Sequence, residues 1–150
     1  MKIDDFVAAF KANSDKVACL KEHVTTKYVP FLTKVAQCKA IVQATMEIQE
    51  QKDGKVLFLQ RTPMRYLIFS MTLIKFYTDI EYDEGEDNSK FAEEYDKLAA
   101  IGAIDLIPVA LPAGEVKEFD TILKMVVDDY FENNRSVASI LGSSLDLLKK

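Results

Sequence analysis

The stretch that decides the fold is residues 62–77, which read TPMRYLIFSMTLIKFY. Thr62 is a favourable helix N-cap and Pro63 suits the first helical position, so the stretch predicts a helix. Apolar residues occupy most sides of it between 66 and 77, and such a helix is normally surrounded by other elements. The apolar run is shorter than the about 20 residues that a membrane span needs. We therefore expect a buried central helix, the hub of the core, and no membrane segment.

Further helices are predicted on both sides from apolar residues spaced three and four apart. They are a short helix after Asp4 or Asp5, a second one after the break at 13–15, helices over 30–44, 89–101 and 114–132, a short turn or helix at 104–107, and a last helix from 136. Any of Asn13, Ser14 and Asp15 can cap the second helix, because their side chains accept from free N–H groups. Gly102 is expected to end the 89–101 helix. Asn133 and Asn134 are expected to separate the last two helices.

One segment alternates apolar and polar residues, which is the period of a β-strand. It covers 46–50, is followed by the turn signal Lys52-Asp53-Gly54-Lys55, and returns through 56–60. Asp-Gly readily supplies the positive φ angles of a tight turn. We expect a β-hairpin over about 46–60. Because an isolated hairpin is only marginally stable in water, it must pack on the helices or pair with another chain.

These patterns predict one mainly helical domain over 1–150, a compact bundle of six or seven helices with one β-hairpin. Hydrophobic residues make up 49% of the chain and charged residues 29%, which is ordinary for a soluble globular protein and argues against a wholly disordered chain. Residues 1–6 carry acids where a signal peptide would have its apolar stretch. A protein without a secretion signal, made in a cytoplasm, is expected.

The net charge of −5 conceals an uneven distribution along the chain. Residues 1–78 hold 12 basic and 7 acidic residues, 79–132 hold 4 and 16, and 133–150 hold 3 and 1. Such segregated charges either pair within the chain or face complementary surfaces on another molecule. A net acidic chain without lysine or arginine clusters is a poor nucleic-acid binder, so no direct nucleic-acid role is expected.

The candidate partner-binding residues are charged side chains on three segments. They are Asp79, Glu81, Asp83, Glu84, Glu86 and Asp87 in an acidic loop, Asp128 and Asp129 in the 114–132 helix, and Lys52 and Lys55 at the hairpin turn. Asp128, Asp129 and Glu132 would crowd the end of a helix, where the dipole disfavours negative charge. Either Arg135 or a basic partner would compensate them.

The acidic loop also invites a calcium interpretation, because hard cations bind clustered oxygens. Its spacing departs from an EF-hand: with Asp79 at loop position 1, the glycine lies at position 7 and Lys90 stands at position 12. A solvated loop or partner-binding patch is favoured, with an adventitious cation site as the alternative.

The chain offers few groups for catalysis. His23 is the single histidine, and Cys19 lies four residues before it, so the two could share a helix face. No oxyanion-hole motif or phosphate-binding glycine loop accompanies them. Cys19 and Cys38 are expected to be reduced, partly buried thiols, with a disulfide or metal pair as the alternative. We therefore expect no enzyme, no cofactor and no metal centre.

Four short segments carry a family resemblance. They are TPMRYLIF at 62–69, FYTDI at 76–80, MVVDD at 125–129 and Glu132-Asn133. They resemble small structural or assembly-block proteins of tailed phages of Gram-positive bacteria, over roughly 25–140. The resemblance brings no catalytic motif and no functional residue. It implies a virion protein, assembled in the bacterial cytoplasm.

The expected function is a head–tail connector (neck) or capsid-associated subunit. It would contact copies of itself in a head-to-tail ring or lattice, and phage portal, capsid or tail proteins. The alternative is a small cytoplasmic adaptor or inhibitor that binds a host protein through its acidic face. An enzyme using His23 and the acidic loop is the third hypothesis.

Overall fold

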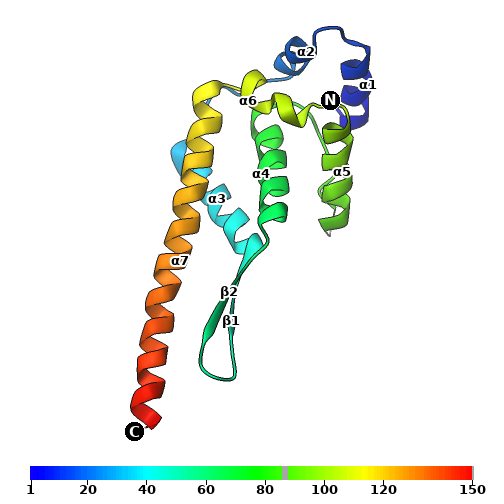
Figure 1. The fold of residues 1–150 in the computed structure, drawn as a ribbon. Coiled ribbons are helices and arrows are strands. Elements are labelled where there is room, and N and C mark those ends of the chain that lie inside the picture. Colours follow the sequence, from blue (N-terminus) through cyan, green and yellow to red (C-terminus); the bar gives the residue numbers. More distant parts are fainter. Residues whose placement is uncertain (86–87, 150) are drawn as a thin grey trace.

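The structure, a computed structural model, describes residues 1–85 and 88–149, with the backbone alone at 88 and 135–149. Its elements are α1 (Ile3–Ala12), α2 (Lys16–Glu22), α3 (Phe31–Thr45), β1 (Met46–Glu50), β2 (Val56–Gln60), α4 (Thr62–Tyr77), α5 (Asn88–Ala100), the 3-10 helix η1 (Ile104–Leu106), α6 (Ile107–Ala110) and α7 (Ala113–Lys149). The predicted class, mainly helical with one hairpin, is confirmed. The hairpin and α7 extend away from the other helices (Figure 1).

Three helices form the body of the molecule, with α3 packed along both α4 and α7. Phe119 of α7 is fully buried at their meeting point. Its ring lies 5.8 Å from Phe69, 6.5 Å from Phe76 and 6.4 Å from Tyr77, all on α4, between ring centroids. Tilted and edge-on rings of this kind stabilise by about 0.5–1.5 kcal/mol a pair beyond their buried area. The aromatic face of α4 therefore meets α7 at Phe119, while α3 packs along α7.

The expected hub role of α4 holds for its second half. Ser70 to Ile74 and Tyr77 are buried, and the hydroxyls of Ser70 and Thr72 donate to the carbonyls one turn earlier, Tyr66 O and Ile68 O, at 2.9 and 2.7 Å. In the first half of the helix, Tyr66 is 56% exposed. The helix also begins one residue earlier than expected: Arg61 is the N-cap, and Thr62 makes no capping bond.

The short helices gather at one end of the body (Figure 1). There α1 packs on α5 and α2, α2 packs on α6, and α5 packs on α4. Phe6 and Phe10, one turn apart on α1, are buried. Asp15, one of the three predicted candidates, caps α2 and accepts from Ala18 N at 3.1 Å. Gly102, at φ +79°, ends α5 as predicted, in the left-handed conformation that glycine adopts without strain.

The hairpin over 46–60 is confirmed, with Met46 opposite Gln60 and Glu50 opposite Val56. Gly54 takes φ 81° in the turn, as an Asp-Gly turn requires. Phe58 of β2 meets Phe131 of α7 edge-on, 5.3 Å between ring centroids. The hairpin thus packs on a helix, one of the two solutions expected of it.

The predicted break at Asn133 and Asn134 is wrong. The backbone stays helical from Ala113 to Lys149, and Asn134 Nδ2 donates to Tyr130 O at 2.6 Å within the helix. Asparagine costs a helix only about 0.5 kcal/mol more than good helix formers, so two of them need not interrupt it. The apolar residues predicted for a last helix, Val137, Ile140, Leu141 and Leu148, lie outside the described side chains.

Candidate partner-binding surfaces

Side chains of the same chain contact part of the acidic loop. Asp79 Oδ1 lies 2.9 Å from His23 Nδ1, and Lys75 Nζ lies 2.7 Å from Glu84 Oε1. The backbone pairs with the first residues of the chain, where Ile3 N donates to Glu81 O at 2.9 Å. The uneven charge distribution left two possibilities, pairing within the chain or contact with another molecule. Pairing within the chain accounts for part of this loop.

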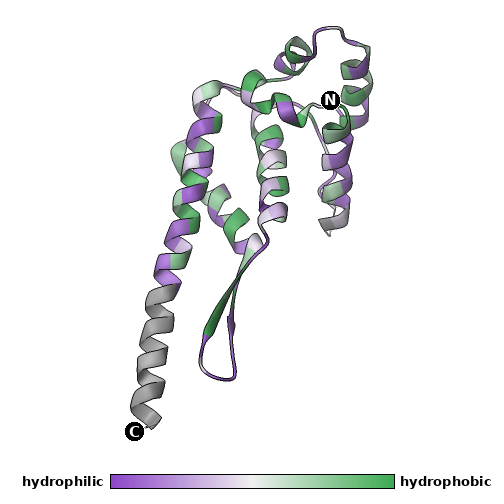
Figure 2. Cartoon of the chain, viewed as in Figure 1, coloured by the Kyte–Doolittle hydropathy of each residue, from purple (hydrophilic) through white to green (hydrophobic). Residues whose placement is uncertain are grey.

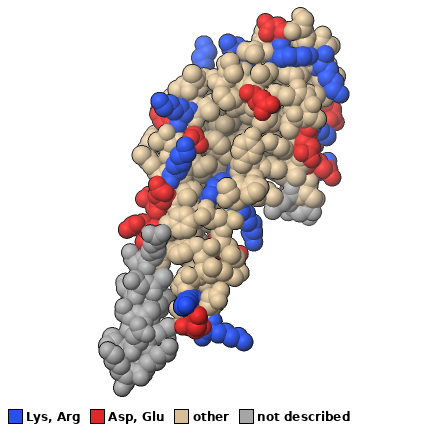
Figure 3. All heavy atoms as spheres, in the orientation of Figure 1, with Lys and Arg blue, Asp and Glu red and all other residues tan. Residues whose placement is uncertain are grey.

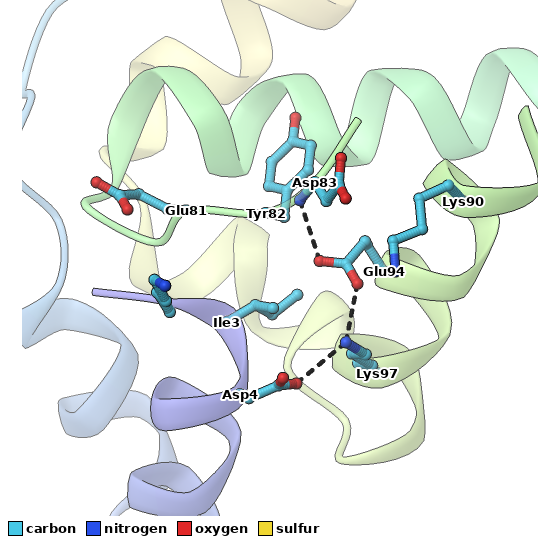
Figure 4. Close-up of a pocket in the computed structure, with 9 residues that line it drawn as sticks. Ile3, Asp4, Glu81, Tyr82, Asp83, Lys90, Glu94 and Lys97 are labelled. Carbon is cyan, nitrogen blue, oxygen red and sulfur yellow. Dashed lines mark hydrogen bonds and ion pairs between the residues drawn. The ribbon is translucent and has the colours of Figure 1, made fainter. Parts of the chain in front are cut away.

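A charged pocket of about 340 Å³ lies between α1, α5 and this loop (Figure 4). Glu94 of α5 is 2% exposed and accepts from Asp83 N at 3.2 Å. Lys97 Nζ lies 2.9 Å from Glu94 and 3.1 Å from Asp4, and these hydrogen bonds raise the pKa of Lys97. The contacts around this pocket therefore connect the acidic loop to α5, and α5 to α1. Nothing in the sequence marked Glu94 as buried, because its charge suggests an exposed position.

The remaining candidate residues do not form one site. Glu86 and Asp87 lie outside the described residues. Asp128 and Asp129 are exposed in the middle of α7 rather than at a helix end, so the expected dipole penalty is absent, and the side chain of Arg135 is not described. Lys52 and Lys55 are exposed at the hairpin turn. Within the described residues, none of Asp128, Asp129, Lys52 and Lys55 forms an ion pair.

A buried charged network that the sequence did not reveal joins α3 to the start of α7. Lys34 is fully buried, and its Nζ lies 2.7 Å from Glu115 Oε2 and 3.1 Å from Glu118 Oε1. The second oxygen of Glu115 accepts from Val29 N at 2.7 Å and from the Tyr77 hydroxyl at 3.1 Å. Buried charges persist only when they are paired and hydrogen-bonded, and each charge here is.

The pKa directions follow from that bonding. Burial opposes the charge of both Lys34 and Glu115, but the hydrogen bonds outweigh it. The pKa of Lys34 is raised above its ordinary value, and the pKa of Glu115 is lowered. Burial, assisted by the Glu115 carboxylate, raises the pKa of Tyr77. One sequence signal existed: Lys34 lies four residues before Cys38, on the apolar face of its helix.

An open apolar groove runs along the other side of α4 and α7, away from α3. It consists of two adjoining hollows of about 290 and 360 Å³ that share Tyr66, Phe69 and Asp120, and we call it the α4–α7 groove. Its apolar walls also include Leu73, Val116, Leu123 and Val127. Figure 3 shows a largely uncharged area on this face between the charged groups of α7 and those of α1 and α5. Apolar surface of this kind, rimmed by charge, is typical of a binding site.

The rim of the groove carries both signs of charge. Lys124 pairs with Asp120 at 2.9 Å, and Arg65 Nη2 donates to Gln60 Oε1 at 2.8 Å. Arg65 Nη1 is buried, and no hydrogen-bond partner for it exists in the described part of the chain. A buried donor without a partner is costly, about 1–3 kcal/mol, so Arg65 is held at a local cost in stability.

The groups that could have supported catalysis are held in structural roles. The His23 ring stacks edge-on against Phe6, 5.2 Å between centroids, besides its contact with Asp79. Cys19 and Cys38 are free thiols and are buried, more deeply than expected. Burial raises the pKa of Cys38 to about 12, and Asp120 adds to the effect. Among the described residues no group of three or more His, Cys, Asp or Glu side chains could hold a metal ion.

Three comparisons with known proteins were negative. No family model, no curated protein and no solved structure matches it. The hydropathy of the helices alternates between faces (Figure 2), and among the described residues no helix is both long and apolar enough for a membrane span.

Proposed function

We propose that this protein is a non-enzymatic structural or assembly subunit of a phage virion, a head–tail connector or capsid-associated protein that acts through protein–protein contacts. The observation that carries the contact-based role is the α4–α7 groove. It exposes Tyr66 and the half-buried side chains of Phe69 and Val127 to solvent in a hollow that no element of the chain covers among the described residues. Surfaces of this composition bind other proteins.

The shape of the molecule supports the same proposal. The hairpin and α7 reach away from the body as two arms joined by the Phe58–Phe131 contact (Figure 1). A two-stranded hairpin presents unpaired backbone groups on both outer edges, which are available for pairing with another chain. The assignment to a virion rests on the resemblance of the segments at 62–69, 76–80 and 125–133 alone.

The alternative, an adaptor that binds a host protein through its acidic face, finds less support. Of the loop acids, Asp79 is engaged by His23 and Glu84 by Lys75. A partner would have to displace these contacts before it met the full charge of the loop.

The experiment that tests the proposal is quantitative mass spectrometry of virions purified from cells in which this gene is expressed during phage growth. We expect the chain in a fixed copy number per particle: about a dozen copies indicate a neck ring, and hundreds indicate a shell component. Absence from particles, together with a stable complex with a host protein, would establish the adaptor instead.

A further inference from the structure

The α7 wall of the α4–α7 groove carries charged side chains of alternating sign. They are, in order, Lys117, Asp120, Lys124 and Asp128, and all four line the groove. Their spacings of three, four and four residues place them on one face of the helix. The third basic residue of the lining, Arg65, lies on the opposite wall, on α4. The α7 wall therefore holds two charges of each sign, in the order positive, negative, positive, negative.

The two inner charges of this series are paired within the chain, and the two outer ones are not. Lys124 Nζ lies 2.9 Å from Asp120 Oδ2. Lys117 and Asp128 are exposed, and neither forms an ion pair with any of the described residues. They are 11 residues apart, about 16 Å along the helix at 1.5 Å per residue, so they cannot pair with each other. One unpaired charge of each sign thus remains, at opposite ends of the groove.

A series with this order is complementary to its own reverse. If two copies of α7 lie antiparallel across a two-fold axis near residue 122, position 117 of one copy faces position 128 of the other, and position 120 faces position 124. Each positive charge then faces a negative one. In a parallel arrangement with the same register, each charge would face its own counterpart, and like charges across an interface repel. The charges therefore favour a second copy in the antiparallel orientation.

The middle of the apolar groove lies at the same level of α7. Tyr66 and Asp120 line both hollows, so they mark the place where the hollows adjoin, and Asp120 is two residues from position 122. The Tyr66 side chain is 56% exposed. A two-fold axis at this level brings the Tyr66 rings of two copies together, where each covers apolar surface of the other groove. Aromatic side chains at the centre of a contact are typical of the residues that carry binding energy.

We propose that the α4–α7 grooves of two copies face each other across a two-fold axis near residue 122, with Lys117 of each copy paired with Asp128 of the other. The inference rests on the contact-based role in the proposed function, and it names the surface and its occupant, a second copy of the chain. The same surface serves both copies, so the contact closes at two. Growth into a ring or lattice would use a second surface of this dimer.

Charge reversal tests the two outer pairs. Sedimentation velocity of the full chain over a range of concentrations should show an equilibrium between monomer and dimer for the wild type. Lys117→Glu and Asp128→Lys each place like charges opposite each other at both ends of the contact, so each should weaken dimerisation at least about tenfold. Asp129→Lys is the matched control, because Asp129 is an exposed neighbour that does not line the groove, and its dimer should be as tight as that of the wild type.

The double variant, Lys117→Glu with Asp128→Lys, distinguishes a paired contact from a general effect of charge. It restores opposite charges across the two-fold axis, and the two positions are too far apart to pair within one chain. Dimerisation should therefore return to within about threefold of the wild type. The single changes alter the net charge in opposite directions, so a loss in both that the double variant reverses cannot come from the overall charge.

Tyr66→Ser tests the apolar centre of the contact. The variant removes the exposed ring that both hollows share, and it should weaken dimerisation at least about tenfold. A dimer as tight as that of the wild type would place the contact elsewhere on the molecule.

The outcomes separate this inference from the proposed function. A chain that stays monomeric at high concentration, a dimer that the single reversals leave intact, or a double variant that does not recover overturns the groove contact. If the chain is nevertheless found in virions, the proposed function stands without it. Recovery of the double variant together with absence from particles supports the dimer and overturns the assignment to a virion.

Discussion

The two sides of the α4–α7 pair differ in what they bury: one side buries charged groups, and the other leaves apolar groups in contact with solvent. On the side that faces α3, Lys34 and Glu115 are buried, yet each of their charged groups has partners. On the other side, Tyr66 and Val127 are apolar or aromatic, yet they remain in contact with solvent in the groove. Folding alone explains the first side, because unpaired charges there would be costly. It does not explain the second, where apolar surface stays uncovered, and this difference is the basis of the proposal that the groove is the surface for a partner.

The largest effect is expected when the buried ion pair on the α3 side loses its cation. Lys34→Met leaves the Glu115 carboxylate buried without its cation, and removing one partner of a buried pair costs about 3–5 kcal/mol. The free energy of unfolding, measured by urea denaturation, should fall by about 3 kcal/mol. Lys39→Met, at an exposed lysine of the same helix, is the matched control and should change it by less than about 0.5 kcal/mol. Equal losses in the two variants would show that the network is not what joins α3 to α7.

The same network sets a pH window for stability. The pKa of Glu115 is lowered from 4.5, so its contribution is present above that pH and is lost as the pH falls through the folded value. The pKa of Lys34 is raised from 10.5, so its contribution is present below that pH and is lost as the pH rises through the folded value. The contribution of this pair should therefore be flat between these limits and decline on both sides, whereas the buried Cys38 thiol, with its pKa raised from 9.0 to about 12, adds a further decline that begins near pH 9. Lys34→Met combined with Glu115→Gln should weaken both declines, and unchanged profiles would contradict the assignment.

A smaller effect tests how the hairpin arm is held. Phe131→Ala removes the edge-on ring contact with Phe58, worth about 1 kcal/mol beyond the buried area. Amide hydrogen exchange should accelerate in β1 and β2 while α3 and α4 stay protected. Met125→Ala, on an exposed face of the same helix, should leave hairpin exchange unchanged. Uniform acceleration across the body would instead make Phe131 part of the global core.

The groove side should respond weakly in stability. Val127→Ala removes two methyl groups from a half-buried site, and at about 0.8 kcal/mol per fully buried group it should cost about 0.8 kcal/mol. Thermal unfolding of both variants compares this loss in the free energy of unfolding with the loss caused by Lys34→Met. A loss as large as that of Lys34→Met would place Val127 in the core and remove the contrast between the two sides.

The smallest effect belongs to the exposed ion pairs of the acidic loop. Both side chains of the Lys75–Glu84 pair are about half exposed. Pairs of this kind contribute about 0–1 kcal/mol, so Lys75→Ala should change the unfolding free energy by less than about 0.5 kcal/mol at moderate salt. A change above 1 kcal/mol, roughly the upper limit for exposed pairs, would show that the loop is held far more firmly than its exposure indicates.

Features of the fold that depend on residues close together in the sequence were predicted correctly. The hairpin follows from alternation and Asp53-Gly54, the start of α2 from Asp15, and the end of α5 from Gly102, because each signal acts within a few residues. The Lys34–Glu115 pair joins residues 81 positions apart, and a lysine on an apolar helix face gives no sign of its partner. The break expected at Asn133 and Asn134 failed because the local preference of asparagine against helix is weak, and Asn134 hydrogen-bonds within the helix. The groove depends on the arrangement of two helices in space, which no local pattern encodes.

The central claim, that the α4–α7 groove is the surface for a partner copy, is tested most directly by hydroxyl-radical footprinting of the full chain at low and high concentration. Tyr66 in the groove and Met125 outside it are both reactive side chains and similarly exposed, at 56% and 59%. We predict that oxidation of Tyr66 falls as the concentration rises while oxidation of Met125 stays constant. Unchanged oxidation of Tyr66 in an oligomer that protects Tyr82 of the acidic loop would contradict the claim and move the interface to the charged end of the molecule.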